Sequence, residues 1–293
     1  MSRPTRKKPS RKKPTSKKAA RKQPAARRPS RKKSTAKKSA KQRPAHVQAS
    51  FAIPPDAVRV WRGFRSSALA QEDFFTRLST VFVPATVEMQ TAIGLDAYIP
   101  TIPAGVKDKP PSVPDETAIL FWDSQQTYQD GFKTLAVRTY TITHGAVYTK
   151  ESRADFPTLF AGKIVPGAPS FLIDAPADWM NGTVEHLIGG PPDATNLPDF
   201  ASQVATVMAG IQSRGAAAGG IVCVGDSYVV YWQLDGKGDR GLDDLRALCG
   251  WSLLRTARPT KLPAGLWDEW PGMAIAPGDS FNMQFERRWE KKK

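Results

Sequence analysis

The first 45 residues follow a five-residue repeat that no compact domain can accommodate. Doublets of lysine or arginine recur at this spacing, prolines from Pro4 onward keep the same period, and each unit is close to Pro-Ser/Thr-Arg-Lys-Lys. A proline in every unit interrupts helices and favours extended backbone. Apart from Met1, alanine is the only aliphatic residue before Val47, so the segment has nothing to bury. The sequence therefore predicts a disordered basic arm over residues 1–45.

Charge separates this arm from the rest of the chain. Residues 1–45 hold 20 basic residues and no acidic ones, whereas the other 248 residues hold 23 basic and 27 acidic residues, a net charge of −4. A long flexible polycation suits a polyanion, because neutralising phosphates releases condensed counterions. Such an arm touches phosphates and reads no bases, so we expect sequence-tolerant nucleic-acid binding. The predicted phosphate contacts are Arg6, Lys7, Lys8, Arg11, Lys12, Lys13, Lys17, Lys18, Arg21, Lys22, Arg27, Arg28, Arg31, Lys32, Lys33, Lys37 and Lys38.

The arm resembles the basic tails of histone H1-like proteins, which repeat Lys, Pro, Ala and Ser. The run Ala20-Arg21-Lys22-Gln23-Pro24 is also similar to core-histone tails. The resemblance implies DNA association, in a nucleoid, a nucleus or the cytoplasm, although RNA or a pure targeting signal is left open. No run of 18 apolar residues indicates a membrane span, and the charged N-terminus is not a secretory signal. Two cysteines form no disulfide framework, so we expect an intracellular protein.

The body begins with apolar residues spaced as in a mixed α+β fold. Residues 58–64 alternate like a half-buried strand, and an amphipathic helix over residues 74–82 should kink or restart at Pro84. Strands over residues 95–99 and 118–122 follow, then a helix through Tyr128, Phe132 and Leu135. A last strand is expected among residues 145–174. The predicted order is β-α-β-β-α-β.

The same order recurs in the second half of the body. A strand over residues 183–188 precedes a helix that opens at Asn196 and Pro198 and closes at Gly215. A hairpin over residues 221–234, a short helix over 242–248 and a strand over 251–254 complete the unit. The fold class is therefore α+β, with tandem ferredoxin-like units, antiparallel sheets that can pack face to face, and a disordered basic arm before them. The predicted boundaries are 1–45 for the arm, 46–175 and 176–256 for the two units, and 257–293 for a Pro- and Trp-rich extension with an edge strand.

This order is similar to that of the dimeric α+β-barrel superfamily, which includes small monooxygenases and haem-binding enzymes. The nearest local likeness is the run from Ile119 to Ser124, followed by a helix that bears Tyr and Phe. The resemblance spans about residues 57–256. A haem-binding member would need a proximal histidine, for which His144 or His186 would be the candidate.

Few residues of the body match a catalytic or metal-ligand motif. The three histidines and two cysteines have no metal-ligand spacing, and no nucleophile elbow or phosphate loop is present, so neither a metal nor a cofactor is predicted. His144 at a helix end and Asp123, placed where a cavity could hold it near Trp122 and Tyr140, are the candidate catalytic residues, although capping or packing explains both.

Three functions follow from these features. The leading hypothesis is a nucleic-acid-associated protein whose arm holds DNA or RNA and whose body forms a homo-oligomer or recruits a partner. The alternative is an α+β-barrel enzyme, monooxygenase-like or haem-binding, that carries a basic tail. A viral coat protein with a genome-binding arm is the third, and the amphipathic helices argue against the jelly-roll body that it would need.

Overall fold

The structure of the chain is a computed structural model that describes residues 52–91, 93–102, 110–179, 182–193, 195–236, 240–257, 281–282 and 285–286. The basic arm over residues 1–45 and its predicted phosphate contacts lie outside these residues, as does most of the C-terminal extension. No helix in the described part of the chain is long and apolar enough to cross a membrane. The chain divides at residue 47, and the body that follows forms one compact unit.

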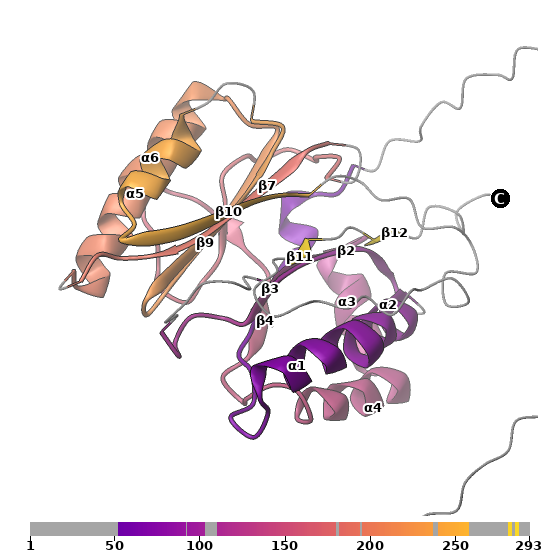
Figure 1. The fold of residues 1–293 in the computed structure, drawn as a ribbon. Helices are drawn as coiled ribbons and strands as arrows, with labels where there is room; N and C mark the ends of the chain where they lie inside the picture. The colour runs from indigo at the N-terminus through magenta and orange to yellow at the C-terminus, as the bar shows by residue number, and fades with distance from the viewer. Residues whose placement is uncertain are drawn as a thin grey trace, which may run out of the picture. The chain divides into compact units, whose positions relative to one another are not determined.

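The first half of the body is an antiparallel sheet with helices on one face (Figure 1). Its strands pair in the order β11-β2-β3-β1-β4, and β12 also pairs with β2. The elements are η1 (Pro55–Ala57), β1 (Val58–Gly63), α1 (Gln71–Arg77), the π-helical turn η2 (Leu78–Phe82), α2 (Val83–Thr91), β2 (Leu95–Ile102), β3 (Glu116–Trp122), α3 (Gln125–Phe132), α4 (Leu135–His144), β4 (Arg153–Asp155), β11 (Phe281–Asn282) and β12 (Phe285–Glu286).

The second half repeats this plan. Its sheet has the order β10-β7-β9-β8-β6-β5, and all pairs are antiparallel except β5 with β6. The elements are β5 (Thr158–Leu159), β6 (Ser170–Phe171), β7 (Val184–Gly190), α5 (Leu197–Arg214), β8 (Gly219–Gly225), β9 (Tyr228–Leu234), α6 (Gly241–Ala247) and β10 (Trp251–Ala257).

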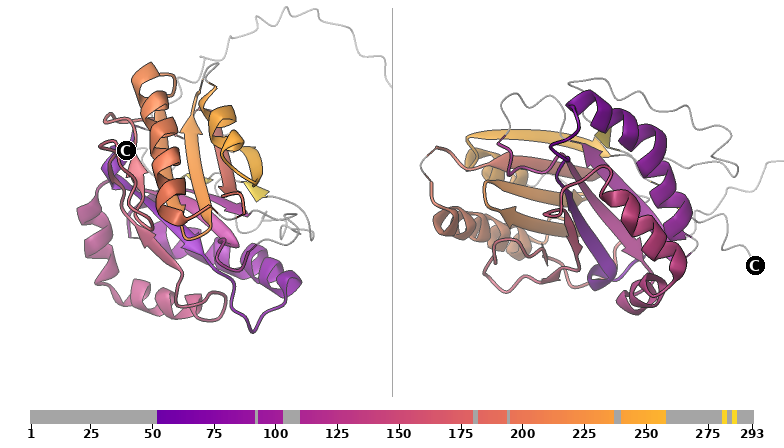
Figure 2. Two further views of the ribbon diagram at one scale, coloured as in Figure 1. Left: turned by 90° about the vertical axis from the view of Figure 1, so that its left-hand side faces the viewer. Right: turned by 90° about the horizontal axis from the view of Figure 1, so that it is seen from below.

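The two sheets bury their inner faces against each other. One apolar core joins Val60 and Phe121 of the first sheet to Ile188 and Trp232 of the second. Helices cover the outer face of each sheet, α1 to α4 on the first and α5 with α6 on the second (Figure 2). Period-two alternation along each strand produces this division, because successive side chains point to opposite faces of a sheet. The expected tandem ferredoxin-like α+β architecture is confirmed.

Two helical segments of the first half can be compared with the helices predicted from the sequence. The single helix expected through Tyr128 and Leu135 is two helices, because Thr134 accepts a hydrogen bond from the Val137 N–H and starts α4 anew. The helix before Pro84 passes through a π-helical turn and restarts at α2, as expected.

The chain leaves the first sheet after β4 and joins the second at β5, within residues 46–175, the range predicted for the first unit. The division into units at residues 175 and 256 stays a prediction. The helices α2, α3 and α4 on the outer face of the first sheet form the roof of a pocket.

Candidate active site

A pocket of about 470 Å³ lies between the outer face of the first sheet and helices α2, α3 and α4. Aromatic side chains dominate its walls, and we call it the aromatic pocket. Its lining residues are Arg59, Trp61, Phe82, Thr86, Gln90, Ile93, Tyr98, Leu120, Trp122, Tyr128, Phe132, Val137, Tyr140, Thr141, His144, Gly145, Tyr148, Thr149, Lys150, Ser152, Arg153 and Ala154.

Strand alternation builds the floor of the aromatic pocket. Val58 and Val60 of β1 enter the core between the sheets, so Arg59 and Trp61 project to the helix-covered face. In β2 and β3 the same alternation directs Tyr98, Leu120 and Trp122 to that face. The floor is therefore made of three adjacent strands, and its side chains are held at the spacing of a regular sheet.

A buried carboxylate fixes three of these aromatic side chains. Glu116 at the start of β3 is fully buried and accepts hydrogen bonds from Trp61 Nε1 at 2.9 Å, from the Tyr98 hydroxyl at 2.5 Å and from the Tyr148 hydroxyl. Burial raises the pKa of Glu116, and the bonds from Tyr148, Tyr98 and Trp61 oppose that shift. Three donors directed at one carboxyl group match its ionised form, which only accepts. Glu116 thus positions lining rings without itself lining the pocket.

His144 is the titratable base of the aromatic pocket. It is the last residue of α4, and its imidazole centroid lies 4.8 Å from that of Tyr140, 4.9 Å from Phe82 and 5.4 Å from Trp61, each ring edge to face. Burial lowers the pKa of His144 below its usual 6.5, against the opposing effect of the Tyr140 carbonyl. Nδ1 of the ring is buried and has no hydrogen-bond partner in the described part of the chain. The imidazole is therefore neutral near pH 7 and able to take up a proton.

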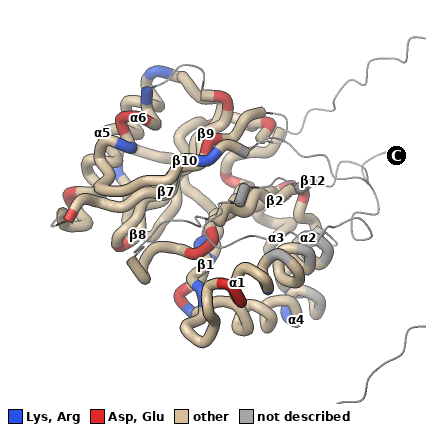
Figure 3. The backbone as a smooth tube through the Cα atoms, viewed as in Figure 1, with Lys and Arg blue, Asp and Glu red and all other residues tan. Residues whose placement is uncertain are grey.

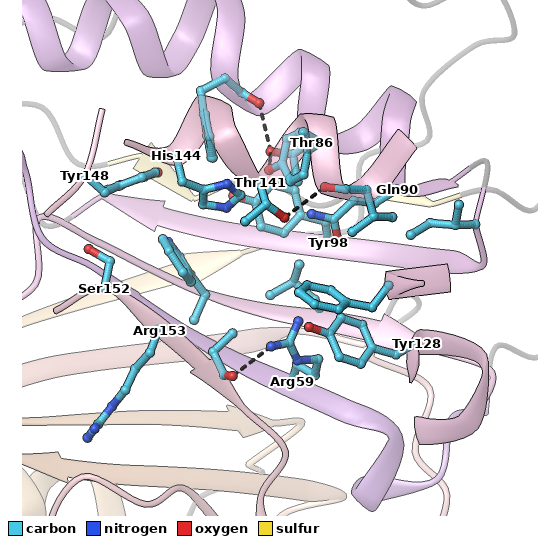
Figure 4. A pocket seen from close by; sticks show the side chains of 18 of the residues that line it. Arg59, Thr86, Gln90, Tyr98, Tyr128, Thr141, His144, Tyr148, Ser152 and Arg153 are labelled. Carbon is cyan, nitrogen blue, oxygen red and sulfur yellow. Dashed lines mark hydrogen bonds between the residues drawn. The ribbon is translucent and has the colours of Figure 1, made fainter. Parts of the chain in front are cut away.

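The two sides of the aromatic pocket differ in polarity. Figure 4 shows His144, Thr141 and Gln90 on the helical side and Arg59 with Tyr128 on the opposite side. The Tyr140 hydroxyl and Thr86 form a buried hydrogen bond above the cavity. A molecule in the pocket would thus meet polar groups at two opposite edges and aromatic faces between them.

The candidate catalytic residues from the sequence occupy different environments. His144 lines the aromatic pocket, whereas Asp123 is exposed and lies in a shallow polar depression beside Ser124. Ser124 supplies the side-chain cap of α3, because its Oγ accepts the Thr127 N–H at 3.1 Å. Both assignments remain predictions, and only His144 has a cavity to act in.

The described residues do not fit a haem. His186 is fully buried between the two sheets, where its Nε2 lies 3.0 Å from the Thr117 hydroxyl, so a cofactor would have to separate the sheets to reach it. Aromatic rings pack edge to face around the His144 imidazole, and a macrocycle bound there would displace them. No group of three His, Cys, Asp or Glu side chains among the described residues could hold a metal ion.

The chain matches no protein-family model and no curated protein. Among solved structures, it is similar to one from Fusobacterium nucleatum described as a "putative monooxygenase", with 7% identity, a TM-score of 0.33, and coverage of 70% of this chain and 91% of the other. An "anthrone oxidase-like protein" has 14% identity and a TM-score of 0.32, with 70% and 92% covered. A "putative monooxygenase" from Lactobacillus acidophilus has 7% identity and a TM-score of 0.30, with 68% and 91% covered.

The leading functional hypothesis from the sequence, a nucleic-acid-associated protein, is corrected here. These similar structures are described as monooxygenase or oxidase-like proteins, and none of them as DNA-binding or histone H1-like. The hypothesis was wrong because it took the function of the chain from the charge of residues 1–45 alone. In the described body, acidic and basic residues are interspersed along the elements (Figure 3), and the marked feature is an apolar cavity.

Sequence reasoning missed Glu116, Tyr98, Tyr148 and Arg59 as site residues. One signal could have indicated Glu116: it shares the period-two face of Ala118, Leu120 and Trp122, so a carboxylate stands on an apolar strand face. A charge in that position must find hydrogen-bond donors on neighbouring elements. Which tyrosines supply them depends on strand register and on the loop after α4, and no local pattern predicts either.

Proposed function

We propose that this chain is an enzyme of the α+β-barrel kind that binds a planar, largely apolar aromatic molecule and removes a proton from it with His144. One observation carries the proposal: a neutral, partly buried imidazole lines a cavity whose other walls are mainly aromatic. A volume of about 470 Å³ is within the range of small-molecule sites. Flat rings favour offset-stacked and edge-to-face partners, so these walls select aromatic ligands.

The residues of the chain supply a proton acceptor and a rigid enclosure. His144 takes a proton from a phenolic O–H or from a C–H made acidic by adjacent aryl rings, and the electron pair stays on the substrate as an anion. Glu116 holds Trp61, Tyr98 and Tyr148 in place, which keeps the substrate plane aligned with the imidazole. Proton transfer from a neutral substrate to the neutral imidazole creates an anion and an imidazolium, and charges in an apolar cavity need a counter-charge or hydrogen bonds. The Arg59 guanidinium, which lines the same cavity, is a counter-charge for the anion.

Dioxygen is the co-reactant that completes an oxidation of this anion. For a methylene between two aryl rings, one molecule of the diaryl methylene and one of dioxygen give one diaryl ketone and one water. Two C–H bonds break, one oxygen atom enters the product as the carbonyl oxygen, and the other leaves as water with both hydrogens. Monooxygenase and oxidase are the activities with which the similar structures are described. The proposal itself rests on the geometry of the aromatic pocket.

Turnover of anthrone tests this function. Anthrone has an acidic methylene between two aryl rings, and its oxidation consumes one dioxygen and yields anthraquinone, so an oxygen electrode and an absorbance trace must agree. The wild-type chain should bind anthrone, seen as quenching of tryptophan fluorescence, and turn it over. His144→Gln should lower kcat by about 10²- to 10⁴-fold and leave binding within about threefold.

Arg138→Gln is the matched control, because Arg138 is exposed on the same helix, α4, and does not line the aromatic pocket. It should turn over anthrone at the wild-type rate. Binding without turnover would reject the oxidation step, equal rates for wild type and His144→Gln would reject the role of the histidine, and absence of binding by anthrone and 2-naphthol alike would reject the aromatic pocket as the site.

A further inference from the structure

The charges that line the aromatic pocket all have the same sign. Arg59, Lys150 and Arg153 are part of its wall, and no Asp or Glu is among the described lining residues. Lys150 and Arg153 are exposed at the rim, and Arg153 lies 3.7 Å from the Asp155 carboxylate and donates to the Gly167 carbonyl. Solvent and a counter-charge therefore already balance the two rim cations.

Arg59 is in a different position. Its side chain is partly buried, its Nη2 donates to the Ala154 carbonyl at 2.7 Å, and its guanidinium carbon lies 3.8 Å from the centroid of the Tyr128 ring. Its Nε is buried without a hydrogen-bond partner, and no carboxylate lies within ion-pair distance of it in the described chain. The nearby carboxylate of Asp155 is engaged by Arg62, which is fully buried.

A cation in this setting has a net cost. Burial lowers the pKa of Arg59, with Tyr128 and then Asp155 acting in the opposite direction, because an enclosed charge prefers a counter-charge that the wall does not supply. A neutral carbonyl and an aromatic face compensate only part of the lost hydration. The charge becomes favourable when an anion enters the cavity and takes the open donors of the guanidinium.

We propose that Arg59 is an anion subsite of the aromatic pocket, and that the ligand is a planar aromatic molecule bearing a carboxylate or an ionised phenol. The planar fork of a guanidinium matches a carboxylate with two parallel hydrogen bonds. The guanidinium lies over the Tyr128 ring, and Arg59 is on the side of the cavity opposite His144 (Figure 4). The anionic group is thus held at one edge of the substrate while its reacting edge meets the imidazole. This inference rests on the proposed function of the same pocket.

A pair of probes that differ only in charge tests the subsite. 2-Naphthoate and 2-naphthamide have nearly the same shape, and their dissociation constants follow from quenching of tryptophan fluorescence in the full chain. Wild type should bind 2-naphthoate at least about tenfold more tightly than 2-naphthamide, the ratio that a charge-assisted pair of hydrogen bonds supplies. Arg59→Gln should reduce this preference to about one and leave the affinity for 2-naphthamide within about threefold. Arg59→Lys, which keeps the charge and loses the fork, should keep part of the preference.

Three further variants locate the effect, and thermal melting checks that each is folded. Lys150→Gln and Arg153→Gln should leave most of the preference intact, and Arg138→Gln, the exposed control on α4, should leave all of it. The subsite is overturned if wild type binds the two probes with equal affinity, or if the preference for 2-naphthoate survives Arg59→Gln. It is also overturned if the preference disappears in Lys150→Gln or Arg153→Gln. In each of these cases binding of 2-naphthamide still supports the aromatic pocket as a binding site. If neither probe binds the wild type, both the subsite and the proposed function are rejected.

Discussion

Two buried side chains, Glu116 and His186, and the partly buried Arg59 differ in how far hydrogen bonds or ring contacts compensate for their loss of solvent. Glu116 receives three hydrogen bonds, His186 has one partner, and Arg59 has a carbonyl and an aromatic face. The number and kind of groups that replace the lost contact with water indicate the role of each residue. Glu116 is a fixed structural anchor, His186 is a neutral core residue, and Arg59 is the group that still lacks a counter-charge.

Replacing Glu116 should lower the free energy of unfolding. Glu116→Gln keeps the shape of the side chain but substitutes an amide nitrogen for an oxygen, so at least one of the donors from Trp61, Tyr98 and Tyr148 loses its acceptor. Leaving a buried donor unsatisfied costs about 1–3 kcal/mol, and the free energy of unfolding measured in urea should fall by that amount.

Glu72→Gln provides the comparison, because Glu72 is an exposed carboxylate in the first turn of α1. Its unfolding free energy should change by less than about 0.5 kcal/mol. A Glu116→Gln protein as stable as the Glu72→Gln protein would show that the three hydrogen bonds do not hold the floor together.

His186 should make the folded body sensitive to mild acid. Burial, with a smaller contribution from Arg255, lowers the pKa of His186 to about 3, whereas a histidine in the unfolded chain titrates near 6.5. Between these values the unfolded state binds one more proton than the folded state, so stability is fully present above about pH 6.5 and falls as the pH drops. The loss is about 1.4 kcal/mol for each pH unit.

The measurement is the unfolding free energy at about pH 7.5, 6.5 and 5.5, before most carboxylates begin to titrate. Wild type should be nearly as stable at the middle value as at the highest, and weaker at the lowest. His186→Gln cannot bind this proton, and its stability should depend less on pH over the same window. Parallel curves for the two proteins would mean that His186 does not remain neutral in the folded state.

At the scale of elements, local sequence signals determined most of the fold. Helix α5 illustrates why: Asn196 accepts the Asp199 N–H at 2.9 Å as the N-cap, and Gly215 ends the helix with a φ of 58°. Both ends are marked by residues whose own chemistry favours those positions, so the sequence predicts them directly. The break between α3 and α4 was missed because Thr134 is a common residue inside helices and its capping bond is visible only in three dimensions.

Two glycines of α5 should respond oppositely to alanine. Gly215→Ala should lower the unfolding free energy by about 1–2 kcal/mol, because no atom lies near the added methyl and the cost is the left-handed backbone alone. Gly210→Ala, inside the helix, should raise it by up to about 1 kcal/mol, since only the flexible end of Arg214 approaches the new methyl. Thermal unfolding of the two variants gives both signs, and a loss of stability in both would show that the helix interior is packed too tightly for alanine.

At the scale of the whole body, the architecture could be predicted from the sequence and the site could not. Repetition of one strand-and-helix order along the chain predicts two sheets, and each apolar strand needs a partner surface, which the other sheet provides. The aromatic pocket depends instead on residues from four strands, from helices α2, α3 and α4, and from the loop after α4. Two of these residues that are in contact, Arg59 and Ala154, lie 95 positions apart in the sequence. Of its chemistry, only His144 was singled out in advance.

The face-to-face pairing of the sheets within one chain also has a consequence for symmetry. In a two-fold dimer of a single ferredoxin-like unit, every substitution occurs twice, so both outer faces must change together. In this chain the two halves are separate stretches of one sequence, so a substitution on one outer face leaves the other outer face unchanged. The first half surrounds an aromatic hollow, whereas the core under α5 is filled by residues such as Val204, Met208 and Ile211. Substitutions can thus enlarge or reshape a cavity in one half of the body while the other half keeps a filled core. A dimer of two identical units cannot have this difference between its halves.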